Sequence, residues 1–336
     1  MTSVVQRPQA GSRRSIERSA DLLDMYYHML LARVLDERMW VLRNQGVASF
    51  VISCQGHEGA QVGTAWALRP GYDWVFPYYR DLGVALVLGV TPRQVMLALL
   101  GRRDDQSSGG RQMPAHYGDA GLKLISVSSP VATQIPQAAG VALATRLSGS
   151  DAVTAVYFGD GATSKGDFHE GLNFAAVHRL PVIFICENNG WAISTPHAQQ
   201  MAVATVAQRA CAYGMPGVSV EGGDVAAVYG AAQEAVQRAR AGDGPTLIEV
   251  HTVRLTPHSS DDDHTRYRSG EELGREQELD PLVLFKRYLE GQRHLTPTLE
   301  DSFQARVAGE VEDATAFALG SPLPSPEELK SQVYAD

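Results

Sequence analysis

An aspartate stands between two glycines directly after an apolar run, in the segment YFGDGATSKG at 157–166. The glycines permit a tight turn, and the residues after it have helical spacing, so the predicted order is strand, turn and helix. Such a helix start binds phosphate, because its unpaired N–H groups and its dipole favour an anion. A carboxylate there would repel a bare phosphate. Asp160 therefore predicts a bridging cation, and Mg²⁺ prefers such oxygen ligands.

Two adjacent asparagines, Asn188 and Asn189, follow the next apolar run, PVIFIC at 181–186. If the two runs are neighbouring parallel strands, the asparagines and Asp160 share the edge of the sheet at which ligands bind. An amide oxygen and a backbone carbonyl can complete the coordination of Mg²⁺. Either motif alone is more often an ordinary turn. Together, with one helix between them, they favour a site for a metal and a diphosphate.

The glycine spacing distinguishes this turn from two common nucleotide-binding motifs. Gly159 and Gly161 are followed by Gly166, and not by a glycine three positions on as in the dinucleotide fingerprint. Lys165 precedes a glycine rather than a serine or threonine, so the segment is not a P-loop.

Histidines and acids gather in and before the polar segment TPHSSDDDHTRYR at 256–268. An imidazole suits proton transfer near neutral pH, which makes His258 the best candidate for a catalytic or diphosphate-contacting group. His251, His258 and His264 with three aspartates also suggest a transition-metal site. Their spacing fits no short zinc pattern, which favours the role in proton transfer.

The composition limits the classes of partner. The chain has 336 residues and a net charge of −9, and this acidic balance argues against general nucleic-acid binding. No apolar run approaches the ~18 residues that span a bilayer, so we expect no membrane partner. The chain contains three cysteines, far apart and without a C-x-x-C pair, which indicates a reducing compartment. They are Cys54, Cys186 and Cys211.

The first 20 residues carry four arginines and a single acid, Glu17. This composition is typical of a flexible N-terminal arm in a cytoplasmic bacterial protein, and also of a mitochondrial transit peptide, which would place the protein in the matrix. We favour the arm.

Helices and strands alternate along the chain. Apolar spacing predicts helices over 21–45, 56–68, 80–89, 91–101, 133–147, 166–180 and 225–242. Apolar runs rich in β-branched and aromatic residues predict strands at 48–54, 74–79, 151–158, 181–186 and 245–255. The alternation predicts a three-layer α/β/α fold with a mostly parallel sheet. After 280 the sequence offers two helical patterns and a proline-rich stretch.

The spacing of GDG, 26 intervening residues at 162–187 and NN resembles the thiamine diphosphate signature. More of the chain, roughly 25–290, is similar to the alpha subunit of the decarboxylating component of 2-oxo acid dehydrogenases. The matching stretches include GHEGAQVG, YYRDLG, GRQMPAHYG, SSPVATQIPQAAG, ENNGWAIS and PHSSDDDHTRYRS. RQMPAHYG and SSPVATQIP are more similar to the branched-chain (2-oxoisovalerate) enzymes than to the pyruvate enzymes.

The resemblance implies a thiamine diphosphate-binding fold over 21–290, between the arm at 1–20 and a helical C-terminal tail at 291–336. It implies that Mg²⁺ is bound by Asp160, Asn189 and the backbone carbonyl of Trp191. The implied cofactor-binding residues are Tyr78, Tyr79, Arg80, Ser129, Val131, Gly159, Asp160, Gly161, Ala162, Asn189 and His258. A turn similar to the potassium site of some members contains Ser128, Pro130, Thr133 and Gln134. The implied substrate pocket contains Phe50, Tyr79, Met113, Pro114, Ala115, His116 and Ser129.

The implied activity is thiamine diphosphate-dependent oxidative decarboxylation of a small 2-oxo acid, with the acyl group passed to a lipoyl-bearing dihydrolipoyl acyltransferase. Two alpha and two beta chains would form the enzyme, and the beta chain would supply the glutamate that activates the cofactor. Glu58 is explained instead as an acid at a helix start. Ser259 resembles the regulatory phosphorylation position of mitochondrial relatives. Glu187 stands where some members have arginine, so one positive contact to the diphosphate is expected to be missing.

Two alternatives remain open at this point. A pyruvate or acetoin dehydrogenase alpha subunit would keep the cofactor and change the substrate. A noncatalytic diphosphate-binding module would bind the cofactor without decarboxylation.

Overall fold

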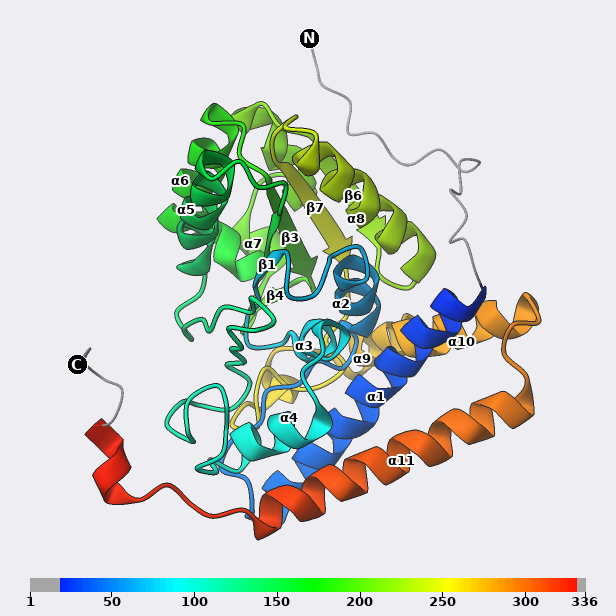
Figure 1. Ribbon diagram of the computed structural model, residues 1–336. Helices are drawn as coiled ribbons and strands as arrows, with labels where there is room; N and C mark the ends of the chain where they lie inside the picture. The colour runs from blue at the N-terminus through cyan, green and yellow to red at the C-terminus, as the bar shows by residue number, and fades with distance from the viewer. Residues whose placement is uncertain (1–18, 331–336) are drawn as a thin grey trace.

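A five-stranded parallel sheet forms the centre of the protein, whose computed structural model describes residues 19–330 (Figure 1). The expected arm at 1–20 lies almost wholly outside these residues. Every pair of neighbouring strands is parallel. In spatial order the strands are β1 (Trp74–Phe76), β2 (Thr154–Gly159), β3 (Val182–Asn188), β7 (Thr246–His251) and β6 (Gly217–Glu221).

Both faces of the sheet are buried, because side chains alternate between two hydrophobic clusters. In β2, Ala155 and Tyr157 enter one cluster, whereas Val156 and Phe158 enter the other. Helices α5 (Gln134–Leu147) and α6 (Gly166–Val177) cover the second cluster, and α8 (Val225–Arg240) covers the first. The prediction of a three-layer α/β/α fold with a mostly parallel sheet is confirmed.

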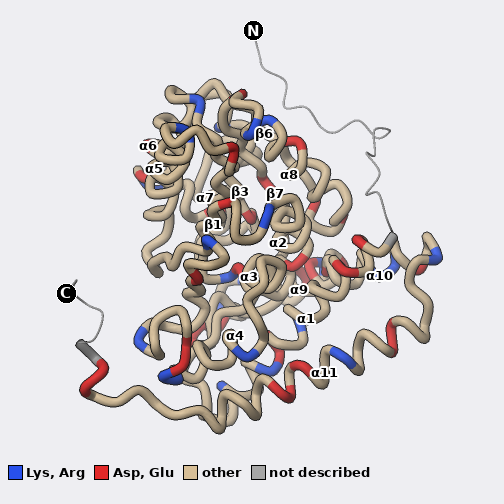
Figure 2. The backbone as a smooth tube through the Cα atoms, in the orientation of Figure 1, with Lys and Arg blue, Asp and Glu red and all other residues tan. Residues whose placement is uncertain are grey.

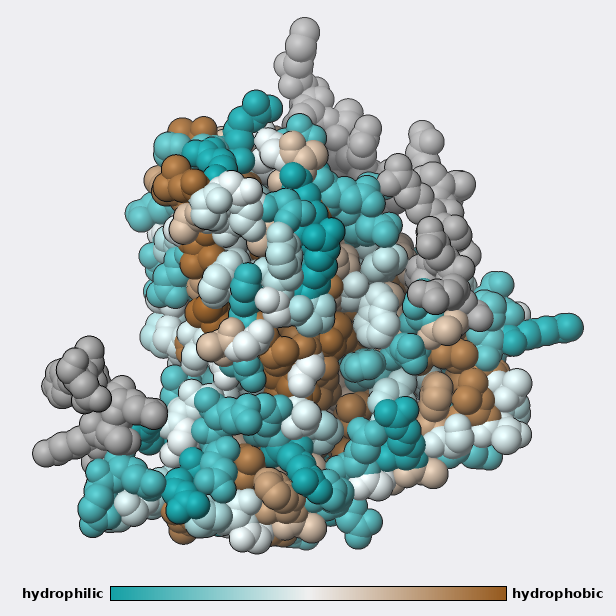
Figure 3. Space-filling model, in the orientation of Figure 1, coloured by the Kyte–Doolittle hydropathy of each residue, from teal (hydrophilic) through white to brown (hydrophobic). Residues whose placement is uncertain are grey.

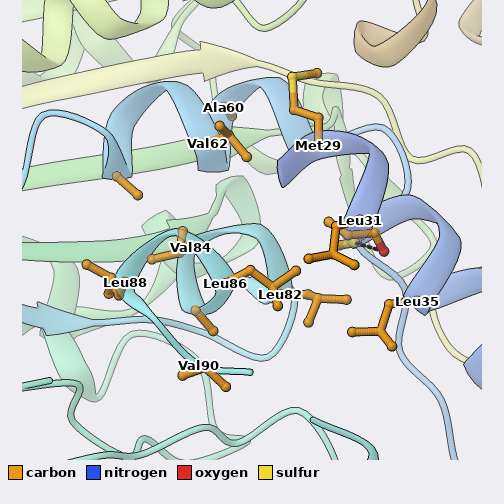
Figure 4. Close-up of a cluster of buried hydrophobic side chains, with 14 of the residues drawn as sticks. Met29, Leu31, Leu35, Ala60, Val62, Leu82, Val84, Leu86, Leu88 and Val90 are labelled. Atoms are coloured by element: carbon orange, nitrogen blue, oxygen red, sulfur yellow. Dashed lines mark hydrogen bonds between the residues drawn. The ribbon is translucent and has the colours of Figure 1, made fainter. Parts of the chain in front are cut away.

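The N-terminal helices pack against one another beside this sheet. They are α1 (Ser19–Asn44), α2 (Glu58–Ala65), α3 (Leu82–Leu88) and α4 (Pro92–Leu99). Figure 4 shows Met29 and Leu35 of α1, Val62 of α2 and Leu82 and Leu86 of α3 in one buried cluster. The start of α4 matches its sequence: the Thr91 hydroxyl accepts from the Gln94 N–H, and Pro92 takes the first helical position.

The C-terminal part contains α9 (Gly270–Glu278), α10 (Pro281–Gly291), α11 (Pro297–Gly320) and the 3-10 turn η4 (Pro326–Lys330). The long helix α11 lies along α1 and α4 (Figure 1). Its residues Val307, Val311, Ala314 and Ala318 are buried in the same hydrophobic cluster as α1. This helix therefore contributes to the core of the N-terminal helices.

The predicted strand at 48–54 is wrong. Residues 51–54 are buried but have no regular secondary structure. This backbone pairs with no strand: the N–H of Cys54 donates to Asp36 at 3.2 Å and that of Val51 to the Ser260 hydroxyl at 3.1 Å, and the Val51 carbonyl accepts from the Ser260 N–H at 2.8 Å. An apolar run indicates only that a segment is buried, and residues 51–54 are buried without forming a strand.

Short elements follow the strands at one edge. They are the 3-10 helix η1 (Asp160–Ser164), β4 (Trp191–Ala192), β5 (Thr195–Pro196), α7 (His197–Gln200), η2 (Val206–Tyr213) and η3 (His264–Arg266). Charges of both signs are interspersed over the described chain (Figure 2). None of the described helices combines the length and the apolar character needed to cross a membrane. All three cysteines are free thiols.

Candidate functional site

Asp160 and Asn189 meet at the carboxyl edge of the sheet. The register pairs Gly159 with Glu187, so the residues that follow β2 and β3 emerge side by side. The backbone of Asn189 lies close enough to the Asp160 carboxyl to lower its pKa. The Gln200 amide donates to Asp160 Oδ2 at 2.9 Å. The structure therefore brings together two of the three predicted metal ligands, and Trp191 follows in β4.

The Asp160 carboxylate is buried with only 1% of its surface exposed. Burial raises its pKa above the ordinary value, although hydrogen bonds oppose this shift. Within residues 19–330 no lysine or arginine forms an ion pair with it. A buried carboxylate without a cationic partner is costly, and a metal cation would offset that charge.

Gly161 allows η1 and β4 to approach closely. A Cβ atom at this position would lie 2.8 Å from the Cβ atom of Ala192. Real Cβ atoms do not approach one another so closely, so a side chain here would displace η1 or β4. The glycine is therefore required by the contact between these two elements.

A cavity opens beside the same strand ends. Six of the predicted cofactor-binding residues line it, together with two residues of the predicted potassium turn and Phe158. The lining consists of Tyr78, Tyr79, Ser128, Ser129, Val131, Gln134, Phe158, Gly159 and Ala162. The tyrosines come from the turn after β1 and the serines from the segment before α5, so distant segments of the chain build one cavity.

The predicted potassium turn gathers oxygen atoms. The hydroxyls of Ser128 and Thr133 lie 2.9 Å apart, and each contacts the carbonyl oxygen of Pro130. Gln134 donates its amide N–H to the Tyr157 carbonyl at 2.9 Å. Its amide oxygen is buried and has no hydrogen-bond partner among the described residues. A cation bound in this turn would satisfy that oxygen.

Arg80 and His258 lie in contact. The buried Arg80 donates to the Ser53 carbonyl at 2.8 Å, to the His258 carbonyl at 2.9 Å and to His258 Nδ1 at 3.0 Å. A ring nitrogen that accepts is unprotonated. Burial, and then the positive charges of Arg80 and Arg254, lower the pKa of His258 to about 3. The imidazole is therefore neutral in this structure, with its proton on Nε2.

Ser259 in the 256–268 segment and His251 before it have structural partners, whereas His264 Nδ1 is buried without a hydrogen-bond partner among the described residues. Ser259 has 9% of its surface exposed, and its hydroxyl accepts from the Asp261 N–H at 3.4 Å. His251 contacts the Ser219 hydroxyl at 2.8 Å. In the described part of the chain no three His, Cys, Asp or Glu residues form a group that could hold a metal. The alternative of a transition-metal site at His251, His258 and His264 is therefore wrong.

The structure brings only some of the predicted substrate residues close to one another. His116 Nε2 lies 2.9 Å from the Ser129 hydroxyl, and Nδ1 lies 3.1 Å from the Met113 carbonyl. A second, mostly apolar cavity has Pro114 and Ala115 in its lining. Phe50 and the exposed side chain of Met113 line neither of these two cavities.

The polar cluster around Glu187 was missed by sequence reasoning. Glu187 is fully buried, and its Oε2 atom accepts from His57 Nδ1 at 2.6 Å, from Gln61 at 3.2 Å and from the Tyr78 hydroxyl at 3.2 Å. Burial, and then the charge of Glu187, raise the pKa of Asp81 well above its usual range. The available signal was the pair His57 and Gln61, four residues apart and so on one helical face.

Glu58 has a structural partner. Its carboxylate accepts from Arg33 at 2.6 Å and from the N–H of Gly56 at 2.8 Å. Arg33 also forms a bidentate pair with Asp280 at the start of α10. This buried group connects α1, α2 and α10.

Comparison with known proteins gives the family. The model of the dehydrogenase E1 component family matches residues 26–327. A 2-oxoisovalerate dehydrogenase subunit alpha of Bacillus subtilis is 49% identical over 94% of this chain and 96% of that protein. A 3-methyl-2-oxobutanoate dehydrogenase subunit alpha of Mycobacterium tuberculosis is 44% identical over 93% of this chain and 82% of that protein.

A human relative, 2-oxoisovalerate dehydrogenase subunit alpha, mitochondrial, is 39% identical over 94% of this chain and 71% of that protein. The matches extend over nearly the whole described chain, including both strand ends that carry Asp160 and Asn189. The chain therefore belongs to the dehydrogenase E1 component family, whose members are thiamine diphosphate-dependent oxidoreductases.

Proposed function

We propose that this chain is the alpha subunit of a branched-chain 2-oxo acid dehydrogenase that acts on 3-methyl-2-oxobutanoate. The observation that carries the proposal is the meeting of Asp160 and Asn189 beside a cavity lined by the predicted cofactor residues. The relatives' names support the substrate class. Pyruvate and acetoin dehydrogenation are the competing activities.

The residues at the sheet edge fit a magnesium diphosphate. Asp160, Asn189 and the carbonyl of Trp191 would hold Mg²⁺, which would neutralise the buried Asp160 carboxylate. The N–H groups of Gly161 and Ala162, with Gly159 at the turn, would bind the diphosphate. The unpartnered amide oxygen of Gln134 supports K⁺ in the turn that also contains Ser128, Pro130 and Thr133.

When bound, thiamine diphosphate supplies the nucleophilic carbon and the electron sink for decarboxylation. Tyr78, Tyr79, Ser129 and Val131 line the cavity and would position its rings. Arg80 fixes His258 with Nδ1 as acceptor, so Nε2–H is the proton that the imidazole can donate to the diphosphate or the reacting group. The loop from Met113 to His116, with Phe50, would contact the acyl chain.

A beta subunit completes the enzyme in this proposal, as two alpha and two beta chains. Glu58 is held by Arg33, so the glutamate that activates the cofactor must come from elsewhere, and we assign it to the partner. Apolar side chains of Leu147, Phe174 and Val177 are exposed on α5 and α6, and Figure 3 shows apolar surface there. Such surface suits a lasting protein interface.

The acyl group would pass to a lipoyl-bearing dihydrolipoyl acyltransferase. The compartment would follow the source cell: the cytoplasm of a bacterium, or the mitochondrial matrix if residues 1–20 act as a transit peptide.

The test is to assay the chain with Mg²⁺ and thiamine diphosphate, with and without the beta chain encoded beside it. We expect decarboxylation only with both chains, and faster with 3-methyl-2-oxobutanoate than with pyruvate or acetoin. Faster turnover of pyruvate or acetoin would identify that compound as the substrate in place of 3-methyl-2-oxobutanoate. Cofactor binding without decarboxylation by the complete complex would indicate a noncatalytic module.

A further inference from the structure

The Glu187 carboxylate connects three segments that carry the candidate site. Its Oε2 atom accepts from His57 at the start of α2, from Gln61 within α2 and from Tyr78 after β1. Glu187 is the penultimate residue of β3, two residues before Asn189. All three donors are buried. The cluster therefore fixes the relative positions of α2, the turn after β1 and the end of β3.

The hydrogen bonds determine the tautomer of His57. Asn189 Oδ1 accepts from the Trp191 N–H at 3.1 Å, so the amide nitrogen is the atom that faces His57 Nε2, at 3.1 Å. An amide nitrogen donates only, so Nε2 must accept and the ring proton is on Nδ1. Nδ1–H in turn donates to Glu187 at 2.6 Å. The order of donation is Asn189 to His57 to Glu187.

This order fixes the rotation of the Asn189 amide. If the amide turned over, its oxygen would face the lone pair of Nε2, and its NH₂ group would face the Trp191 N–H. Both contacts would then be repulsive. The present orientation leaves the second lone pair of Oδ1 free to bind a cation. Groups that orient a metal ligand in this way typically change metal affinity 10–100-fold when they are removed.

We propose that His57 and Glu187 are positioning residues, which hold the Asn189 amide oxygen in the orientation that binds the divalent cation of the cofactor. This inference rests on the proposed function of Asp160 and Asn189. Neither His57 nor Glu187 contacts the cation in this account. They act through Asn189 alone, and this distinguishes the role from general packing.

The experiment measures Mn²⁺ affinity of the full chain with its beta partner and thiamine diphosphate, from the electron paramagnetic resonance signal of free Mn²⁺. We expect His57→Ala to weaken Mn²⁺ binding 10–100-fold. Glu187→Gln keeps an acceptor for Nδ1–H and should lose less affinity than Glu187→Leu. Glu58→Gln is the matched control, because this buried carboxylate starts the same helix but contacts Arg33 and Gly56. Its Mn²⁺ affinity should equal that of the wild type.

A double-mutant cycle separates positioning from packing. If His57 acts through Asn189, His57→Ala should cause no further loss of affinity in an Asn189→Ala background. Fully additive losses would overturn the proposal, as would unchanged Mn²⁺ affinity in both His57→Ala and Glu187→Leu. Glu187→Leu tests the same point if His57→Ala does not fold. Asp160→Ala reports on the proposed function separately: if it too leaves Mn²⁺ binding unchanged, the metal site itself is misplaced.

Discussion

Gly161→Ala should damage the candidate site through backbone displacement alone. The added Cβ atom would lie 2.8 Å from Ala192 Cβ and 3.3 Å from Ala192 Cα. Neither atom belongs to the flexible end of a side chain, so η1 or β4 must move by several tenths of an ångström. Overpacking of this kind destabilises a protein by about 1–3 kcal/mol. For a chain of this size we expect the unfolding temperature to fall by a few degrees.

The same displacement moves the N–H groups of Gly161 and Ala162, which we assign to the diphosphate. A hydrogen bond to a charged group contributes about 1.5–3 kcal/mol, and weakening such bonds to the diphosphate should give roughly tenfold weaker cofactor binding. Calorimetry with Mg²⁺ and thiamine diphosphate measures the affinity, and thermal unfolding measures the stability. Gly166→Ala is the matched control, because its Cβ atom would meet only Glu170 Oε1 at 3.8 Å. If the two variants behave alike, the reasoning about η1 and β4 is refuted.

Four further predictions follow from the same site. His258→Ala should lower turnover ~10²–10⁴-fold and weaken cofactor binding much less, which steady-state kinetics and calorimetry on one preparation would decide. Ser259→Glu should be nearly inactive, because it places a negative charge in a buried position next to His258, which we assign to the cofactor site; a wild-type rate would contradict this assignment. The folded protein favours the neutral form of His258. The stabilisation that comes from this neutral imidazole should be present above pH 6.5 and be lost as the pH falls toward 3. The difference in unfolding free energy between the wild type and His258→Gln should decrease by at most ~1.4 kcal/mol for each unit by which the pH falls. A difference that stays constant with pH in denaturant titrations would argue against the lowered pKa of His258. The isolated chain should not decarboxylate 2-oxo acids, and full activity without a beta chain would refute the assignment of the activating glutamate to a partner.

Patterns within single segments were sufficient to predict the strands and the helix that lead to the candidate site at the carboxyl edge of the sheet. The buried runs that became β2 and β3, and the helix between them, follow from continuous apolar sequence and glycine turns. Parallel strands then bring Asp160 and Asn189 together, because the carboxyl ends of such strands share one edge. The roles of these residues were implied by the family resemblance, and they remain predictions.

Contacts between distant segments could not be predicted in this way. His57 and Glu187 are 130 residues apart, and their hydrogen bond depends on how α2 packs against the sheet. The segment at 51–54 has the composition of a strand, but Asp36 and Ser260 bind its backbone. In both cases polar groups of a distant segment bind the residues, and apolar periodicity contains no information about such contacts.

We assign Asp160 to the cation that holds the cofactor diphosphate. The most direct test is calorimetric titration of thiamine diphosphate, with and without Mg²⁺, into the complex containing wild-type chain, Asp160→Ala or Asp167→Ala. Asp167→Ala removes the same charge from the first turn of α6. We predict Mg²⁺-dependent binding to the wild type and the Asp167 variant, and none to Asp160→Ala. The unfolding temperature of cofactor-free Asp160→Ala should not fall, because burial already disfavours the carboxylate charge. Unchanged cofactor affinity in Asp160→Ala would show that this carboxylate does not bind the cation.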